Sequence, residues 1–318
     1  MPGPDLTIAI IHHGIRGYPQ ECIESLAPLP AGTELLLVQA DSAAPIRAQA
    51  RVIPVARDAS RAAAKNLAVA EARGEYLLLA ASDTLAGPGT VERLRKFVGE
   101  AGAPVVASAQ LLQENGMPRR TGFALPAIAR ELDFFGWLWR QRHYAVRSSK
   151  PPAVGPVRRV EALHAAFLMA RRETFRSVGE FAEGYRFAFE DLEWSWRAGR
   201  KGVALCFCPD APAYKLAPQL KGALSPALGL ALEASQWRCV RAARSAAYAR
   251  SFRAVRASKS LAIWLAAAAL NRLFGGASEF LSNEAAVRRA IWKMRPDATP
   301  GAELPPDIES RVRWEAFL

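Results

Sequence analysis

The first third of the chain alternates short apolar runs with stretches of helical character. The apolar runs, rich in Val, Ile and Leu, predict four strands: Leu6–Ile11, Glu34–Val38, Arg51–Val55 and Tyr76–Ala80. The other stretches predict three helices: Pro19–Leu26, the Ala-rich Arg61–Ala72, and Thr90–Gly99. Such alternation is typical of an α/β fold with a mainly parallel sheet, whose ligands bind beyond the carboxyl ends of the strands.

The rest of the chain has an irregular segment, then a regular α/β part, and then a basic helical end. The irregular segment, residues 119–150, is basic and aromatic, and it forms either a flap beside a binding site or a second layer of core. Regularity then returns, with predicted strands at Val160–Ala170 and Val203–Cys208 and predicted helices at Arg172–Val178 and Glu190–Arg200. From Leu216 to Leu318 the pattern is helical. We therefore predict two domains, an α/β domain over 1–215 and a basic helical extension over 216–318.

Composition narrows the class of protein and of partner. The 318 residues are 51% hydrophobic and 23% charged, which suits a packed core and excludes wholesale disorder. Lys and Arg number 42 against 30 Asp and Glu, a net charge of +12. This surplus favours nucleotides, nucleic acid or an acidic membrane surface as partners, and composition alone does not choose among them.

Cysteine spacing and the apolar runs bear on the compartment. The four cysteines form no CxxC pair, which predicts buried, reduced thiols in a cytoplasmic protein. The N-terminus lacks the features of a signal peptide, and the longest apolar run, Leu261–Leu270, is shorter than the roughly 20 residues that span a bilayer. We expect a soluble or peripheral cytoplasmic protein.

The basic extension has an amphipathic pattern. On a helical wheel one face carries the apolar residues, and most of the arginines fall outside it; the face consists of Trp237, Val240, Tyr248, Phe252 and Val255. Two interpretations stay open at this point. The helix either lies on an anionic membrane or packs on the protein with its arginines solvated.

Two adjacent acids are the strongest chemical signal. Glu190 and Asp191 follow an aromatic run at the predicted start of a helix. They are either first-turn acids that stabilise the helix terminus or a general base that removes a proton from a hydroxyl group. The pair by itself does not decide between these roles.

The surrounding motifs carry a resemblance to a known family. FEDLEWSWR at 189–197 resembles the family motif FEDVDLCWR, and VGEFAE at 178–183 is similar to VGGFDE. In the first half, RAAAKN at 61–66 resembles GxAxARN, and GEYLLLAASDT at 74–84 resembles GEYLLFLNPDT. From Leu6 to Lys215 the chain thus resembles family 2 glycosyltransferases, especially the bacterial rhamnosyltransferase-like branch.

The resemblance implies a fold, a reaction and a set of site residues. The fold would be GT-A, an α/β sandwich that binds a nucleotide-diphosphate sugar, with Asp191 as general base and Glu190 beside it. Mg²⁺ or Mn²⁺ would bridge the diphosphate at Asp83. The remaining implied positions are His13 beside the nucleobase, Lys65 near the diphosphate, Asn66 bracing the loop, and Trp194 and Arg197 on the acceptor side.

Three departures from the family pattern concern the donor site. Gln39 stands where the family has an Asp that contacts the base, and Asp41 could replace that Asp only after a local shift. Ala81 removes one acid of the metal motif, and Lys215 takes the place of a histidine that often completes the metal site. We predict that Lys215 itself neutralises the departing diphosphate, which makes turnover weakly dependent on metal or independent of it.

Two functions follow, from different classes. The first is an inverting glycosyltransferase that moves a sugar from a UDP- or dTDP-linked donor to a hydroxyl of a cell-surface polysaccharide or lipid-linked glycan. The second is a catalytically degenerate GT-A protein that acts as a scaffold through its basic tail. Nucleic-acid binding ranks last, because no recognised nucleic-acid module is present, and no specific nucleic-acid partner is expected.

Overall fold

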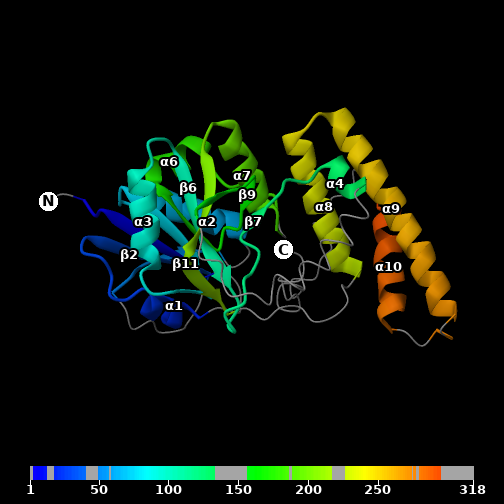
Figure 1. Ribbon diagram of the computed structural model, residues 1–318, viewed down its shortest axis with the longest axis horizontal. Helices are drawn as coiled ribbons and strands as arrows, with labels where there is room; N and C mark the ends of the chain where they lie inside the picture. The colour runs from blue at the N-terminus through cyan, green and yellow to red at the C-terminus, as the bar shows by residue number, and fades with distance from the viewer. Residues whose placement is uncertain are drawn as a thin grey trace. The chain divides into compact units, whose positions relative to one another are not determined.

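The computed structural model describes residues 3–12, 18–40, 49–56, 59–132, 156–185, 188–216, 226–273, 275–276 and 279–294. The chain groups into two compact units (Figure 1). The described parts of the first unit lie within 3–125, 156–185 and 190–216, and those of the second within 126–132, 188–189 and 226–294. The second unit thus takes in two short segments that precede the predicted boundary at 215.

A nine-stranded sheet forms the centre of the first unit (Figure 1). Along the sheet the strands are β3 (Arg51–Val55), β2 (Thr33–Ala40), β1 (Leu6–His12), β4 (Tyr76–Ala81), β10 (Phe167–Arg171), β6 (Val105–Leu112), β11 (Ala204–Lys215) and β5 (Thr84–Ala86), with β8 (Arg158–Arg159) beside β11. The four adjacent strands β3, β2, β1 and β4 are parallel to one another, and β6 is parallel to β11. Strand β10 runs antiparallel to both of its neighbours, β4 and β6. The predicted α/β class with a mainly parallel sheet is confirmed.

Helices cover both faces of this sheet, which explains why its central strands are apolar throughout. One face packs against α1 (Pro19–Ser25) and α3 (Thr90–Glu100). The other packs against α2 (Arg61–Glu71), α6 (Arg172–Val178) and α7 (Glu190–Arg200). All five helices were predicted. Helix α2 begins at Ser60, whose hydroxyl accepts a hydrogen bond from the Ala63 amide and so caps the helix.

Several strands differ from the prediction. The predicted strand Val160–Ala170 is two strands, because β9 (Ala162–Leu163) pairs with β7 (Gly122–Phe123) in a separate small sheet while β10 enters the main sheet. Strands β5, β6, β7 and β8 were not predicted. Strand β11 continues beyond its predicted end to Lys215, through a register shift between Cys208 and Pro212 that lets the strand accommodate its prolines.

The second unit is helical over its described residues, as predicted. It contains α4 (Ile128–Leu132), α8 (Pro226–Ala243), α9 (Ala246–Leu273) and α10 (Glu279–Lys293). In the part of the chain that the structure describes, no helix is both long and apolar enough to pass through a bilayer. The four cysteines are buried and free, in agreement with the prediction.

The apolar face predicted from the helical wheel is used for packing. Helix α8 ends at Ala243 and α9 begins at Ala246, so the predicted single helix is two. Trp237, Val240 and Phe252 come together in one buried cluster between these helices. Of the two interpretations of this face, packing on the protein is therefore the correct one.

Candidate functional site

The acid pair lies at the start of α7, directly after a strained backbone. Ala188 and Phe189 have φ angles of 47° and 74°, the left-handed region that non-glycine residues rarely adopt. Glu190 and Asp191, the first two residues of the helix, are 5% and 6% exposed. Two adjacent buried acids behind a strained turn are costly to the fold, and this combination is typical of functional sites.

Glu190 is paired with a lysine from α2. Lys65 Nζ donates a hydrogen bond to Glu190 Oε1 at 2.9 Å, and both side chains are 7% exposed. Burial opposes ionisation of Glu190, but the charges of Lys65 and Arg61 outweigh it and hold the pKa of Glu190 below its ordinary value. The structure thus brings together two of the predicted residues, and Glu190 is a fixed anion beside Asp191.

Asp191 has the opposite shift. Its carboxylate accepts hydrogen bonds from the backbone amides of Ala165 at 3.3 Å and Leu192 at 3.0 Å. Burial, and next the negative charge of Glu190, raise the pKa of Asp191 to about 6. A carboxylate that is more basic than usual and still ionised at neutral pH has the properties of a general base.

Asp83 follows the end of β4 and is held by Lys215 from the end of β11. The antiparallel pairing of β11 with β5 places Lys215 opposite Thr84, the residue after Asp83. Lys215 Nζ donates to Asp83 Oδ1 at 2.7 Å and to Oδ2 at 2.8 Å. Burial opposes ionisation of Asp83, but the charge and hydrogen bonds of Lys215 lower its pKa. The prediction that a lysine lies at the family's metal position therefore has a geometric basis, although its role stays a prediction.

This donor set does not fit a divalent cation. Both oxygens of Asp83 bind an ammonium group, whose positive charge repels a metal ion at the same place. Within the described residues, no cluster of three or more His, Cys, Asp or Glu side chains could ligate a metal.

A residue that the sequence did not single out, His164, lies between the two acidic centres. His164 starts the three-residue turn that separates β9 from β10, and its Nδ1 accepts a hydrogen bond from the Ala166 amide at 3.1 Å. The same turn binds Asp191 through the amide of Ala165, and the carbonyl of Ala166 accepts from the Ala81 amide at 2.8 Å. One turn thus connects the segment that carries Asp191 with the end of β4, two residues before Asp83.

The geometry fixes the protonation of His164. Because Nδ1 accepts the hydrogen bond from Ala166, the proton of the neutral ring is on Nε2, which makes that atom a donor. Burial, and then the charges of Lys215 and Lys65, lower the pKa of His164 to about 3, so the ring is neutral at physiological pH. The sequence did not indicate this donor role, because His164 lies inside a run that was predicted to be a single strand.

Gln39 lies at the carboxyl end of β2, beside the end of β1. Among the described residues, nothing donates a hydrogen bond to its buried side-chain oxygen, Oε1. A buried acceptor without a donor costs about 1–3 kcal/mol, so its persistence calls for a ligand or another explanation. The other two residues predicted near the base, His13 and Asp41, lie outside the described residues.

Asn66 braces a loop. Its Nδ2 donates to the Phe181 carbonyl at 2.9 Å and its Oδ1 accepts from the Phe181 amide at 2.7 Å. The bracing role predicted for Asn66 is visible in these bonds, whereas its contact with a nucleotide stays a prediction.

Trp194 and Arg197 also face this loop. Trp194 is 1% exposed, stacks on Phe181 at 4.8 Å between ring centroids, and donates from Nε1 to the Gly179 carbonyl at 2.8 Å. Arg197 binds Glu193 at 2.8 Å and the Val178 carbonyl at 3.0 Å. These are packing contacts, and the acceptor-side role of the two residues remains a prediction.

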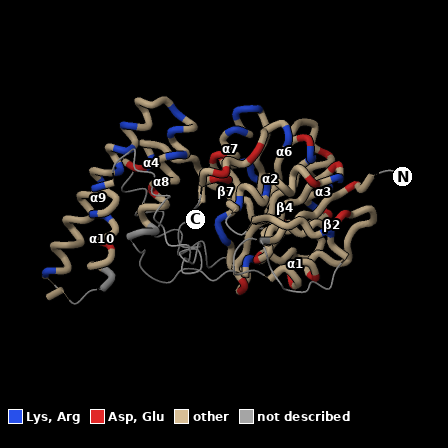
Figure 2. Tube along the Cα trace, turned by 180° about the vertical axis from the view of Figure 1, so that it is seen from behind, with Lys and Arg blue, Asp and Glu red and all other residues tan. Residues whose placement is uncertain are grey.

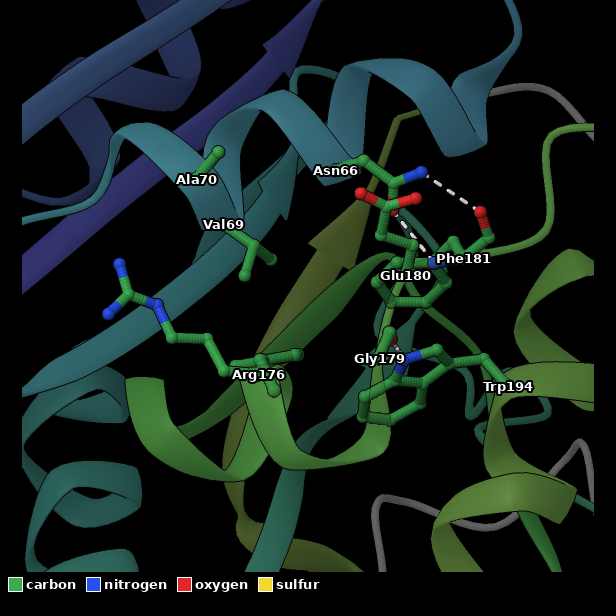
Figure 3. Close-up of a pocket in the computed structure, with 9 residues that line it drawn as sticks. Asn66, Val69, Ala70, Arg176, Gly179, Glu180, Phe181 and Trp194 are labelled. Carbon is green, nitrogen blue, oxygen red and sulfur yellow. Dashed lines mark hydrogen bonds between the residues drawn. The ribbon is translucent and has the colours of Figure 1, made fainter.

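A cavity of about 210 Å³ lies beside this loop (Figure 3). Its wall includes Asn66, Val69, Phe181 and Trp194, and the figure shows these side chains converging from α2, α7 and the loop before α7. Of the predicted site residues that the structure describes, Asn66 and Trp194 alone line it, so we do not take it as the donor site.

Comparison with known proteins identifies the fold. No protein-family profile and no curated protein matches the chain. Among solved structures, GalNAc-T7 with UDP, GalNAc and Mn²⁺ superposes with a TM-score of 0.53 at 14% identity, over 74% of this chain and 47% of that one. S. aureus TarS gives 0.47 at 15% identity, over 78% of this chain and 42% of TarS. The chain thus spans less than half of either structure.

The superposition on GalNAc-T7 shows that the first unit has a fold of the GT-A glycosyltransferase type, as the sequence predicted. At 14% identity the likeness carries the fold alone.

Proposed function

We propose that the protein is an inverting glycosyltransferase of the family 2 type, similar to the rhamnosyltransferase-like branch. It moves a sugar from a UDP- or dTDP-linked donor to a hydroxyl of a cell-surface polysaccharide or lipid-linked glycan. The observation that carries the proposal is the turn His164–Ala166. Its backbone binds the carboxylate of Asp191, whose pKa is raised, and also binds the end of β4, two residues before Asp83. These groups lie at the edge of the sheet where α/β proteins bind ligands.

In the reaction, Asp191 removes the proton of the acceptor hydroxyl. The acceptor oxygen then forms a bond to the anomeric carbon from the side opposite the diphosphate, and the bond from that carbon to the phosphate oxygen breaks. Because its pKa is raised to about 6, Asp191 is ionised at neutral pH before the reaction and is a stronger base than an ordinary carboxylate. Glu190 stays with Lys65 as a fixed charge that maintains this basicity.

The departing diphosphate needs positive charge, which cationic side chains supply here. Lys215, Lys65 and Arg119 all act electrostatically on His164, and Arg61 acts on both Asp83 and Glu190. Lys215 can turn from Asp83 toward a phosphate oxygen, and the Nε2–H of His164 adds a neutral donor. This arrangement supports turnover without a divalent metal.

The unpaired oxygen of Gln39 supports a uracil or thymine base. Both bases carry an N3–H donor, which would satisfy the buried Oε1 at the end of β2. Cytosine has an acceptor at this ring position and could reach the oxygen only through its exocyclic amino group. We therefore assign Gln39 to the nucleobase and favour UDP- or dTDP-sugars.

The cellular setting follows from the same reaction. A transferase that uses a nucleotide sugar to build cell-envelope polysaccharide would act at the cytoplasmic face of the membrane, as a peripheral protein. The net charge of +12 supports contact with an anionic surface.

Calorimetric titration with UDP, dTDP and GDP, each with Mn²⁺ and then with EDTA, tests the proposal. Binding of a pyrimidine diphosphate that survives EDTA is expected. If no nucleotide binds under either condition, the first unit is a degenerate GT-A domain and the scaffold alternative takes its place. If binding requires Mn²⁺, the enzyme stands but the role of Lys215 does not.

A further inference from the structure

Helix α9 carries an exposed apolar stripe that is separate from the face used for packing. Leu265, Leu270 and Leu273 are 56%, 45% and 81% exposed. Three exposed alanines, Ala262, Ala266 and Ala269, lie between or beside them. At 100° per residue these six positions fall within an arc of about 140°, and the stripe is about 17 Å long.

The opposite side of α9 is occupied by α10. Trp264 stacks on Trp292 at 5.6 Å between ring centroids, and Asn271 Nδ2 donates to Ser282 Oγ at 2.9 Å. Ala267, on this side, is 5% exposed. The stripe is thus the outer face of a packed helical pair, and its exposure is not a consequence of missing helix–helix contacts.

The helical unit that carries the stripe has a surplus of basic residues. Between 226 and 294 the chain has eleven Lys and Arg and three Asp and Glu, and Figure 2 shows the basic positions distributed along α8, α9 and α10. Arg256 and Lys259 are neutralised by Glu131 and Glu233. The surplus therefore comes from exposed groups such as Arg272 at the end of the stripe, and Arg289 and Lys293 on the neighbouring helix.

This charge selects between two occupants of an apolar face. A second copy of the chain would bring two units of net positive charge together, and their charges would repel each other. An anionic bilayer neutralises them instead, while its acyl region accepts the leucines. The stripe is too short to cross a bilayer but long enough for a helix that lies in its interface, and the exposed Arg272 stands at one end of it.

We propose that the α9 stripe is the surface by which this protein attaches, in the plane of the interface, to a membrane rich in anionic lipid. The proposal deepens the proposed function, on which it rests for one point only: attachment brings the enzyme to a lipid-linked acceptor. It also replaces the face predicted from the helical wheel, which is buried.

Vesicle flotation with the full chain tests the surface. The probes are phosphatidylcholine vesicles, with and without a large share of phosphatidylglycerol. The stripe variant is Leu265→Glu/Leu273→Glu. The matched control is Leu29→Glu/Val52→Glu, which adds the same charge at residues 39% and 48% exposed in the first unit. Circular dichroism melting verifies that both variants fold.

Wild type is expected to float with the anionic vesicles, and less so as salt is raised. The stripe variant should lose about tenfold or more in partitioning, while the control stays within about twofold of wild type. Failure of wild type to float overturns the proposal, as does an equal loss in both variants, which would indicate charge alone. A dimer that the stripe variant dissociates, without vesicle binding, assigns the stripe to a second copy.

Nucleotide binding separates this surface from the proposed function. In lipid-free solution the stripe variant should bind UDP like wild type, because the stripe is remote in sequence from the candidate site. If wild type floats with vesicles but binds no nucleotide, the proposed enzyme activity is contradicted and the proposed membrane-binding surface is still supported.

Discussion

Lys215 Nζ binds both carboxylate oxygens of Asp83, at 2.7 and 2.8 Å. In the resemblance described above, Asp83 is the acid that holds a metal ion, and Lys215 stands where a histidine often completes the site. In the proposed site the ammonium group of Lys215 would therefore take the place of the metal ion. Substitutions at position 215 should therefore show whether Lys215 does the work of a metal ion.

Lys215→Met should lower kcat about 100-fold, because a preorganised charge that stabilises the leaving group is lost. Lys215→His should recover activity only with Mn²⁺, since the imidazole and the released Asp83 would provide two metal ligands. Turnover of the donor, with EDTA or Mn²⁺, is the measurement, and Lys96→Met at a 75% exposed lysine is the control. EDTA-sensitive wild type with an unimpaired Lys215→Met would contradict the prediction.

The rate of transfer should depend on pH through Asp191. Its pKa, raised to about 6, means that the base becomes protonated and kcat/KM falls as pH decreases through 6. Glu190→Gln removes a negative charge that raises this pKa, so the acidic limb should move to lower pH. A pH–rate profile of both proteins tests the sign. A limb that stays in place or moves upward would exclude Glu190 as the group that tunes Asp191.

His164 can be divided into its two hydrogen-bonding functions. The Oδ1 of an asparagine can take the place of Nδ1 and accept from the Ala166 amide, but asparagine has no equivalent of the Nε2 donor. His164→Asn should therefore keep the melting temperature near that of wild type and weaken UDP binding about tenfold. His164→Phe should lower both. Calorimetry and thermal melting on the same preparations measure the two effects, and full UDP affinity in His164→Asn would remove His164 from the site.

The sequence predicted the layers of the fold better than the site. The strands β1 to β4 and the helices α1, α2, α3, α6 and α7 were predicted because burial on both faces of the sheet produces continuous apolar runs. Position 164 was hidden for a related reason: a turn of His-Ala-Ala between two apolar runs reads as one strand, and only the pairing of β9 with β7 divides it.

The local sequence pattern could not predict ion pairs or contacts between helices, because these join residues that are far apart in the chain. The pair Lys65–Glu190 joins residues 125 positions apart, which the sequence brought together only through the family resemblance. The wheel that placed an apolar face on the basic extension assumed one helix. It therefore missed that the face forms a core and that the exposed stripe lies farther along α9.

Gln39 offers a test in which stability and binding change in opposite directions. Gln39→Met keeps the shape of the side chain and removes the buried oxygen that has no donor among the described residues. The free energy of unfolding should stay the same or rise by about 1 kcal/mol, because an unpaired buried acceptor is lost. UDP affinity should fall about tenfold, because the base loses its acceptor.

Gln110→Met is the matched control. Gln110 is 9% exposed and its Nε2 donates to the Leu111 carbonyl at 2.9 Å, so this substitution should destabilise the fold. Denaturant unfolding and calorimetry on both variants give the comparison. If Gln39→Met lowers stability as Gln110→Met does, and leaves UDP binding unchanged, the oxygen of Gln39 serves the fold and the nucleobase assignment is wrong.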